Sequence, residues 1–135
     1  MGAENAVLAA VTKTLDEAFV RYVNAGEVDR LVATCYAEGA LVLPPQAPLV
    51  RGRGQIRELF RELIEAGMGD VTHETLPLYA EGDLAYGLGT YASTTCALGA
   101  RPVRDAGKYL LVYRRQVDGA WRVAVEMFNS DLAAR

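Results

Sequence analysis

The feature that most constrains the fold is a hairpin pattern in the last quarter of the chain. Two runs rich in β-branched and aromatic residues, 107–116 and 121–129, flank the dipeptide Asp118-Gly119. Asp-Gly between two such runs is the strongest short-range signal for a β-hairpin. If these two residues form the turn, the last residue of the first run pairs with the first residue of the second, which fixes the register of both strands.

This register divides the hairpin into two faces, and both are mostly apolar. One face carries Leu110, Val112, Val123, Val125 and Met127. The other carries Tyr109, Leu111, Tyr113, Ala124, Phe128 and, opposite Leu111, the carboxylate of Glu126. A strand that is apolar on both faces lies between other layers of a fold. A carboxylate within such a wall is therefore the most informative residue of the sequence.

The rest of the sequence predicts helices first and strands afterwards. Apolar residues recur at helical spacing in three segments, 4–24, 28–36 and 55–66. Extended segments are predicted at 40–43, 71–79, 84–96, 108–116 and 121–129. This order indicates the α+β class, with the three helices on one face of a strongly curved antiparallel sheet.

Length and charge limit the classes of function. A chain of 135 residues predicts one domain, spanning 1–135. The net charge is −3 and basic residues form no block, which argues against nucleic acid and anionic membranes as partners. The two cysteines lack CxxC spacing, and the sequence shows neither a signal peptide nor a long apolar run. We therefore expect a cytoplasmic protein with reduced thiols.

Several short motifs resemble those of nuclear-transport-factor-2-like proteins. They are Asn24-Ala25-Gly26-Glu27, Tyr36-Ala37-Glu38-Gly39-Ala40 before Pro44, Arg51-Gly52-Arg53-Gly54-Gln55-Ile56, Gly107-Lys108-Tyr109 and Gly119-Ala120-Trp121-Arg122-Val123. The match spans nearly the whole chain and is nearest to the SnoaL-like branch and its sibling families of unknown function. It implies a cone of three helices against a curved sheet, a deep apolar pocket and, usually, a homodimer.

The resemblance leaves the activity open, because the superfamily includes ketosteroid isomerase, polyketide cyclases, dehydratases, an epoxide hydrolase and members that only bind or assemble. Phe19 occupies the position of the helix tyrosine of ketosteroid isomerase, and Leu43 that of its general-base aspartate. Steroid isomerisation by that apparatus is therefore not expected. SnoaL-type cyclases carry an acidic residue in the last strand, which matches Glu126, but their partner histidine has no match here.

Glu126 is the candidate general base. Burial in apolar surroundings raises the pKa of a carboxyl group towards the range useful for proton transfer near neutral pH. Tyr109 and Tyr113, which flank it on the same face, can donate hydrogen bonds to a developing enolate oxygen. The alternatives are a structural ion pair with Arg122, Lys108 or another basic group, or a position on the outer or dimer surface of the sheet.

His73, the only histidine, can reach the pocket as an acid or base, although a surface or structural position is the alternative. It has no histidine or cysteine neighbour, and no nucleotide or flavin motif occurs, so we expect neither a metal nor a cofactor. The expected pocket wall consists of Phe19, Tyr22, Leu43, Phe60, Leu111, Ala124 and Phe128.

Two hypotheses of function follow from these residues. The first is an isomerase, cyclase or dehydratase that uses acid–base chemistry on a small apolar carbonyl compound. The second is a non-catalytic module that binds an apolar ligand or forms dimers. A homodimer is expected in either case, because both sheet faces carry apolar residues and the helices can cover only one.

Overall fold

The computed structural model describes residues 3–132, with side chains from residue 6 onward. Three helices and seven strands follow one another as α1 (Ala3–Ala25), α2 (Val28–Cys35), β1 (Tyr36–Leu43), β2 (Val50–Arg51), α3 (Gly52–Glu65), β3 (Met68–Thr75), β4 (Tyr79–Glu81), β5 (Leu84–Thr95), β6 (Val103–Arg115) and β7 (Trp121–Ser130). The strands form one sheet in the order β2-β1-β7-β6-β5-β3, and β4 pairs with β5. No helix in this part of the chain is long and apolar enough to cross a membrane.

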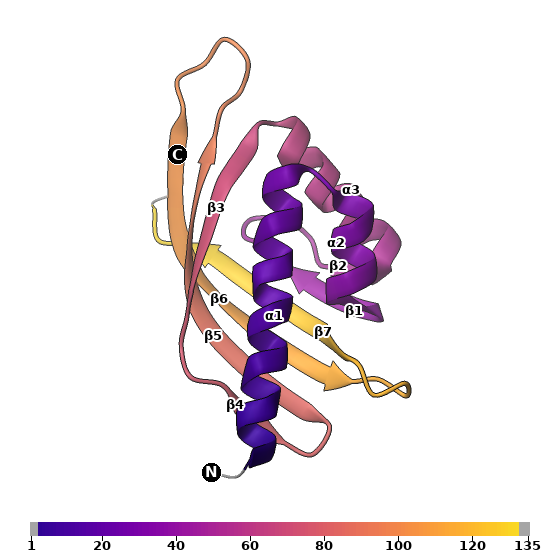
Figure 1. Cartoon of the computed structure of the whole chain (residues 1–135). Coiled ribbons are helices and arrows are strands. Elements are labelled where there is room, and N and C mark those ends of the chain that lie inside the picture. The colour runs from indigo at the N-terminus through magenta and orange to yellow at the C-terminus, as the bar shows by residue number, and fades with distance from the viewer. Residues whose placement is uncertain (1–2, 133–135) are drawn as a thin grey trace.

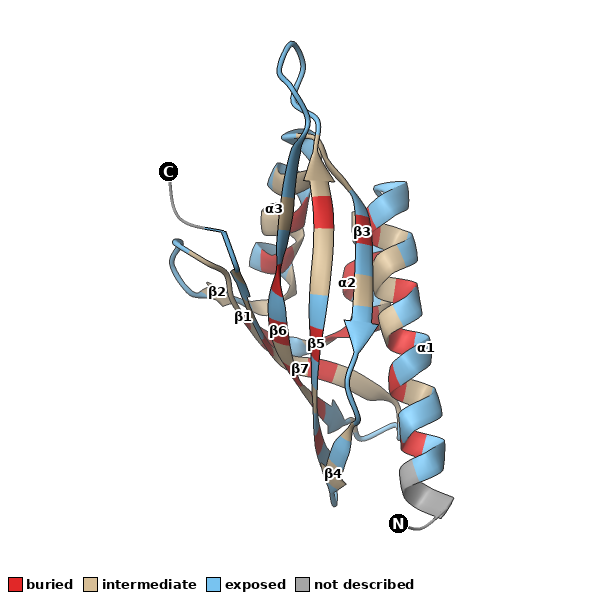
Figure 2. Cartoon of the chain, turned by 90° about the vertical axis from the view of Figure 1, so that its left-hand side faces the viewer, coloured by how far each residue is buried: buried red, intermediate tan, exposed pale blue. Residues whose placement is uncertain are grey.

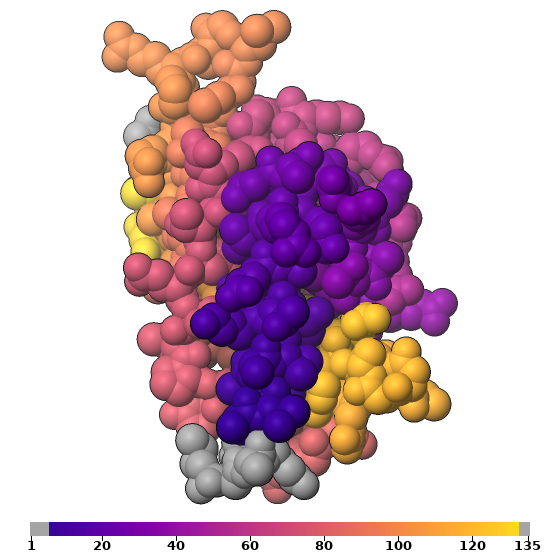
Figure 3. All heavy atoms as spheres, viewed as in Figure 1, coloured from indigo at the N-terminus to yellow at the C-terminus, as the bar shows by residue number. Residues whose placement is uncertain are grey.

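The sheet curves around the helices, which all lie against its concave face (Figure 1). Helix α1 runs across the front of the molecule and covers the strands behind it (Figure 3). Its apolar stripe, with Leu8, Leu15 and Val23 buried, faces the sheet at helical spacing. The predicted α+β class, with three helices on a curved sheet, is thus confirmed.

The sheet is mixed, so the prediction of a wholly antiparallel sheet is wrong in one place. Strand β1 pairs with β7 in the parallel direction, whereas the other strand pairs are antiparallel. A parallel pair needs a long crossover connection rather than a tight turn. Here the whole segment from β2 to β6 supplies it, which is why local sequence patterns did not reveal the pairing.

The β6–β7 hairpin forms as predicted, but its turn is one residue longer. The Gln116 N–H donates to the Ala120 carbonyl (2.7 Å), and the Gly119 N–H donates to the Gln116 carbonyl (2.9 Å). Gly119 has a φ of +88°, as in a turn that is followed by a glycine bulge. As a result Arg115, and not Gln116, pairs with Trp121.

A bulge in β7 restores the predicted register away from the turn. Tyr113 pairs with Val123, but the adjacent Val112 pairs with Val125. Ala124 is therefore the extra residue of the bulge, and Val123 takes the inward position that the sequence analysis gave to Ala124. Beyond the bulge the cross-strand pairs are the predicted ones.

Two glycines let tyrosine rings lie across the concave face. In the β5–β6 ladder, Gly89 pairs with Tyr109, and Tyr91 pairs with Gly107. A Cβ atom added at Gly89 would overlap the Tyr109 hydroxyl, and one at Gly107 would lie 2.6 Å from a Tyr91 ring carbon. Each ring thus covers the glycine of the neighbouring strand, a position that no larger residue can occupy without moving the ring.

Candidate active site

A cavity of about 310 Å³ lies between the three helices and the concave face of the sheet. Its wall is mostly apolar, and polar side chains enter it at a few places. These polar residues are Asp16, Cys35, His73, Tyr91, Ser93, Thr95, Asp105, Tyr109, Tyr113 and Glu126. A largely apolar cavity of this size with a few convergent polar groups is typical of small-molecule sites.

The structure places four of the seven expected wall residues at this cavity, namely Phe19, Phe60, Leu111 and Phe128. The other three do not line it. Ala124 belongs to the bulge described above. Leu43 pairs with Met127, which is 43% exposed on the outer face, so both side chains point away from the helices. Tyr22 packs its ring under the Arg21 guanidinium, 4.9 Å from the ring centre.

Glu126 lies on the cavity wall with only 6% of its surface exposed. The Tyr36 hydroxyl donates a hydrogen bond of 2.6 Å to its Oε1 atom. Burial raises the pKa of Glu126, while the Tyr36 hydrogen bond and the nearby His73 act in the opposite direction. The carboxyl group is therefore protonated more readily than a carboxyl group in water.

The structural alternatives for Glu126 do not occur in the described part of the chain. Glu126 forms no ion pair there. Lys108 pairs instead with Asp131 (2.6 Å), and the Arg122 guanidinium donates to the Trp121 carbonyl. The carboxylate thus faces the cavity with a single neutral donor.

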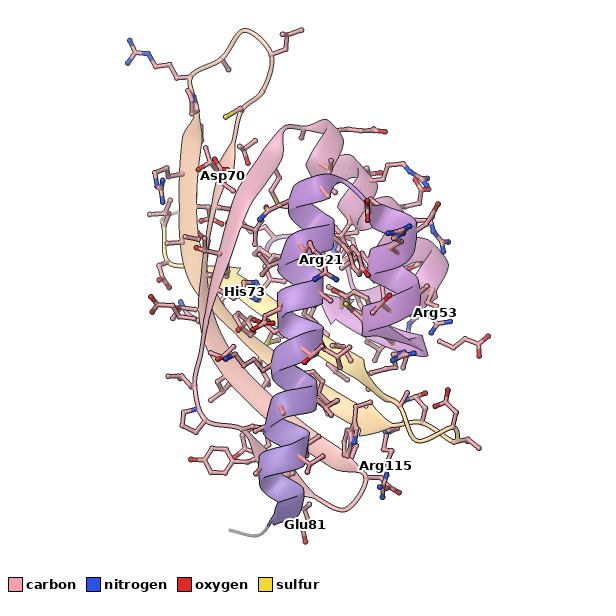
Figure 4. All side chains as sticks on the ribbon, viewed as in Figure 1. Arg21, Arg53, Asp70, His73, Glu81 and Arg115 are labelled. Atoms are coloured by element: carbon pink, nitrogen blue, oxygen red, sulfur yellow. The ribbon has the colours of Figure 1, made fainter. Side chains whose placement is uncertain are left out.

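His73 enters the same cavity from β3, between α1 and the sheet (Figure 4). Its Nδ1 atom lies 2.7 Å from Oδ1 of Asp16 on α1, and the two side chains are 10% and 11% exposed. Because a carboxylate only accepts, Nδ1–H is the donor. Nε2 has no hydrogen-bond partner in the described part of the chain and can exchange a proton with a ligand. A carboxylate that orients an imidazole in this way is a recurrent catalytic arrangement.

Two aromatic rings hold the imidazole between them. The Phe19 ring centre is 5.2 Å from that of His73, and the Tyr109 ring centre is 4.6 Å away on a tilted plane. The Tyr109 hydroxyl is buried and has no hydrogen-bond partner among the described residues. Burial raises the pKa of Tyr109 and of Tyr113, so both hydroxyls stay protonated and can act as donors.

The sequence analysis missed Asp16 and Tyr36. Asp16 lies four residues after Thr12 and three before Phe19, and residues at this spacing share one face of a helix. An acidic residue on the buried face of the first helix was therefore the sequence feature that could have indicated Asp16. Tyr36 is fully buried at the boundary of α2 and β1. No local pattern points to it, because its contact with Glu126 depends on the parallel pairing of β1 and β7.

Comparison with known proteins gives one family match and many structural matches. A family model for the SnoaL-like domain matches residues 17–124. A ketosteroid isomerase-like protein from Erwinia carotovora atroseptica superimposes with a TM-score of 0.82 at 19% identity, over 92% of this chain and 96% of that chain. No curated protein matches the sequence significantly.

Two further structures carry enzyme descriptions. A proposed dehydratase of the nuclear-transport-factor-2-like family from Streptomyces avermitilis has a TM-score of 0.74 at 17% identity, over 93% of this chain and 97% of that chain. A proposed aromatic ring hydroxylase from Novosphingobium aromaticivorans has a TM-score of 0.76 at 20% identity, over 92% and 89%. At these sequence identities the similarity supports a shared fold and does not extend to a shared activity.

Proposed function

The chain belongs to the SnoaL-like domain family, and we propose that it is a cofactor-free enzyme that moves protons on a small, largely apolar carbonyl compound. The reaction class is that of an isomerase or of a cyclase- or dehydratase-type lyase. The main support for this proposal is that two hydrogen-bonded pairs of ionisable side chains, Asp16 with His73 and Tyr36 with Glu126, lie at the same cavity. Asp16 and His73 enter from α1 and β3, and Glu126 enters from β7 with Tyr36 behind it.

In the proposed reaction, Glu126 removes a proton from the carbon next to the carbonyl group, and the electron pair moves onto the carbonyl oxygen. Burial makes this carboxylate a stronger base than one in water, because its pKa is raised. The Tyr113 hydroxyl donates to the developing enolate oxygen, whereas the Tyr109 hydroxyl lies against Gly89 and is closed off from the cavity. His73, held by Asp16 and protonated on Nε2, then delivers that proton to a second carbon in an isomerisation, or to a departing hydroxyl in a dehydration, as the electron pair returns from the oxygen. Glu126 gives its proton to solvent and His73 takes one up, which restores both groups.

The rival function is a non-catalytic module in which the cavity only holds an apolar ligand. An ion pair between Glu126 and an arginine would favour that function, because it would occupy the carboxylate with a structural role. Glu126 has instead a neutral donor on one oxygen atom, which leaves its second oxygen available for chemistry. This contact supports the enzymatic proposal over the rival.

The test is exchange of α-hydrogen for deuterium in a panel of cyclic ketones, such as cyclohexanone and 2-tetralone, followed by NMR in D₂O. The wild-type protein should accelerate exchange for at least one ketone. Glu126→Gln should reduce this acceleration by about 10²-fold or more, as expected for loss of a general base. His73→Gln should reduce it less, because exchange at the α-carbon does not need the proton that His73 delivers to a second position. Asp83→Asn, which alters an exposed carboxylate paired with Arg115, should leave it unchanged.

Two results would speak against the enzymatic proposal. If wild-type protein accelerates exchange of no ketone but binds one of them in the cavity, the binding module becomes the better account. If Glu126→Gln exchanges ketones at the wild-type rate, the role of Glu126 as the base is wrong. Circular dichroism of each variant establishes that the fold is retained.

We propose in addition that two copies of the chain associate through the outer face of the sheet. This face, which is turned towards the viewer in Figure 2, lies opposite the helices. Large apolar side chains are exposed on it, with Tyr86 at 45%, Leu88 at 39% and Met127 at 43%. Contiguous apolar surface of this kind on a sheet is commonly covered by a second subunit.

Sedimentation at micromolar concentration tests the association. The wild-type protein should sediment as a dimer, and Leu88→Glu should shift it towards the monomer because a buried charge without a partner opposes association. A wild-type protein that sediments only as a monomer would remove the proposed interface.

A further inference from the structure

The cavity contains a second group of polar side chains that the proposed proton transfers do not use. Its centre is Asp105 on β6, which lines the cavity and is half-buried. The Tyr91 hydroxyl donates to Oδ2 of Asp105 at 2.9 Å, and the Ser130 hydroxyl donates to Oδ1. Ser93, which is 7% exposed, pairs with Asp105 across the ladder and also lines the cavity.

The carboxylate of Asp105 retains capacity to accept a ligand. It has no ion-pair partner within residues 3–132, and its two hydrogen-bond donors are neutral hydroxyls. A carboxylate offers about four acceptor positions, so roughly two remain after Tyr91 and Ser130 have donated. A half-buried carboxylate with free acceptor positions is stabilised by any further donor that the cavity admits.

This group lies far along the sheet from Glu126. Asp105 is six residues before Leu111 in β6, and Leu111 pairs with Glu126. At about 3.3 Å per residue, six residues correspond to roughly 20 Å along the strand. Between these levels Phe128 pairs with Tyr109, and both residues line the cavity. An aromatic stretch of wall thus separates Asp105 from Glu126, and His73 packs on the Tyr109 ring in this stretch.

We propose that Asp105 and Ser93 form a second binding subsite that accepts a hydrogen bond from a hydroxyl group of the ligand. This inference rests on the proposed function, because it concerns the same cavity. It narrows the substrate class to elongated apolar molecules that carry the reacting carbonyl at one end and a hydroxyl at the other. Tyr91 and Ser130 donate to the same carboxylate without filling its acceptor positions, and the Tyr91 ring lies over Gly107.

Three rigid bicyclic probes test the subsite by fluorescence titration. They are 4-phenylphenol, 4,4′-dihydroxybiphenyl and 4-hydroxy-4′-methoxybiphenyl, which are longer than a naphthol. The methoxy compound resembles the dihydroxy compound but cannot donate a hydrogen bond at its far end. The wild-type protein should bind 4,4′-dihydroxybiphenyl about tenfold more tightly than 4-phenylphenol, since a hydrogen bond to a charged group contributes a factor of this order. The methoxy compound should show no such gain.

Variants assign the gain to particular groups. Asp105→Asn should reduce the tenfold gain to about threefold or less without changing the affinity for 4-phenylphenol, and Ser93→Ala should also reduce the gain. Tyr91→Phe removes an internal hydrogen bond of Asp105 but keeps the carboxylate, so it should retain the gain. Equal loss of the gain in Tyr91→Phe and Asp105→Asn would indicate a structural role and overturn the assignment.

The remaining outcomes separate the subsite from the function on which it rests. If wild-type protein binds 4-phenylphenol but gains nothing from the second hydroxyl, the subsite is wrong and the proposed function stands. If Asp105→Asn and Ser93→Ala both keep the full gain, the hydroxyl binds elsewhere and the subsite is again wrong. If no probe binds the wild-type protein, the ligand-binding role of the whole cavity fails, and the subsite fails with it.

Discussion

Removal of the buried Tyr109 hydroxyl should stabilise the protein, whereas most substitutions of buried residues destabilise it. This hydroxyl has no hydrogen-bond partner among the described residues, and a buried polar group without a partner costs about 1–3 kcal/mol of folding free energy. Tyr109→Phe removes the hydroxyl while keeping the ring that contacts His73. The variant should therefore be as stable as the wild-type protein or more stable, by up to about 3 kcal/mol.

Tyr91→Phe is the matched control. Tyr91 lies in the adjacent strand, and its ring also covers a glycine, but its hydroxyl donates to Asp105. Loss of a hydrogen bond to a carboxylate that is partly exposed should destabilise the protein by about 1 kcal/mol. The two variants should then differ in melting temperature by several degrees, at roughly 4 °C per kcal/mol for a domain of this size.

Chemical denaturation with a linear extrapolation measures both variants, and thermal melting provides the second readout. The reasoning is refuted if Tyr109→Phe is destabilised as much as Tyr91→Phe. Such a result would mean that the Tyr109 hydroxyl already has a partner in the folded protein, such as an ordered water molecule. The structural account of the His73 environment would then have to include that partner.

The other predictions concern the packing, the ionisation and the thiols of the cavity. Gly89→Ala should lose about 1–3 kcal/mol of stability in denaturant unfolding, because the new methyl group overlaps a tyrosine hydroxyl and lies 2.6 Å from a backbone carbonyl, whereas Gly39→Ala, with open space around it, should be tolerated. Burial raises the pKa of Glu126 above its ordinary value of 4.5, so the stability that it contributes is complete below that value and is lost as pH rises through the folded pKa. Glu126→Gln cannot ionise, and unfolding measured from about pH 4 to about pH 8 should therefore show the variant gaining stability relative to wild type; an unchanged difference would contradict the raised pKa. Burial raises the pKa of the Cys35 thiol to about 12, so a thiol reagent should label the exposed Cys96 in the native protein and Cys35 only after unfolding.

The parts of the fold that the sequence predicted are those with strong local signals. Asp118-Gly119 located the hairpin, and helical spacing located the three helices, because turn chemistry and apolar periodicity act over a few residues. The placement of Glu126 opposite Leu111 also followed from the hairpin alone and is observed. This pairing was predicted correctly although the predicted turn was one residue too short, because the bulge at Ala124 compensates for the additional turn residue.

The parts that the sequence did not predict depend on contacts between distant segments. The parallel pairing of β1 with β7 brings Tyr36 to Glu126 across 90 positions, and no local pattern encodes that distance. The pair of Asp16 with His73 similarly joins α1 to β3 across 57 positions. The sequence analysis did not single out Asp16, and its pairing with His73 became evident only with the packing of α1 on the sheet.

The most direct test of the central proposal is a crystal structure of the protein with 2-naphthol, whose phenolic oxygen resembles that of an enol. If Glu126 and His73 act on the reacting group of a ligand, this oxygen should lie within hydrogen-bond distance of the Glu126 carboxyl group or the His73 imidazole, with the rings against the apolar wall. A naphthol bound only on the outer face of the sheet, with the cavity closed to it, would contradict the account.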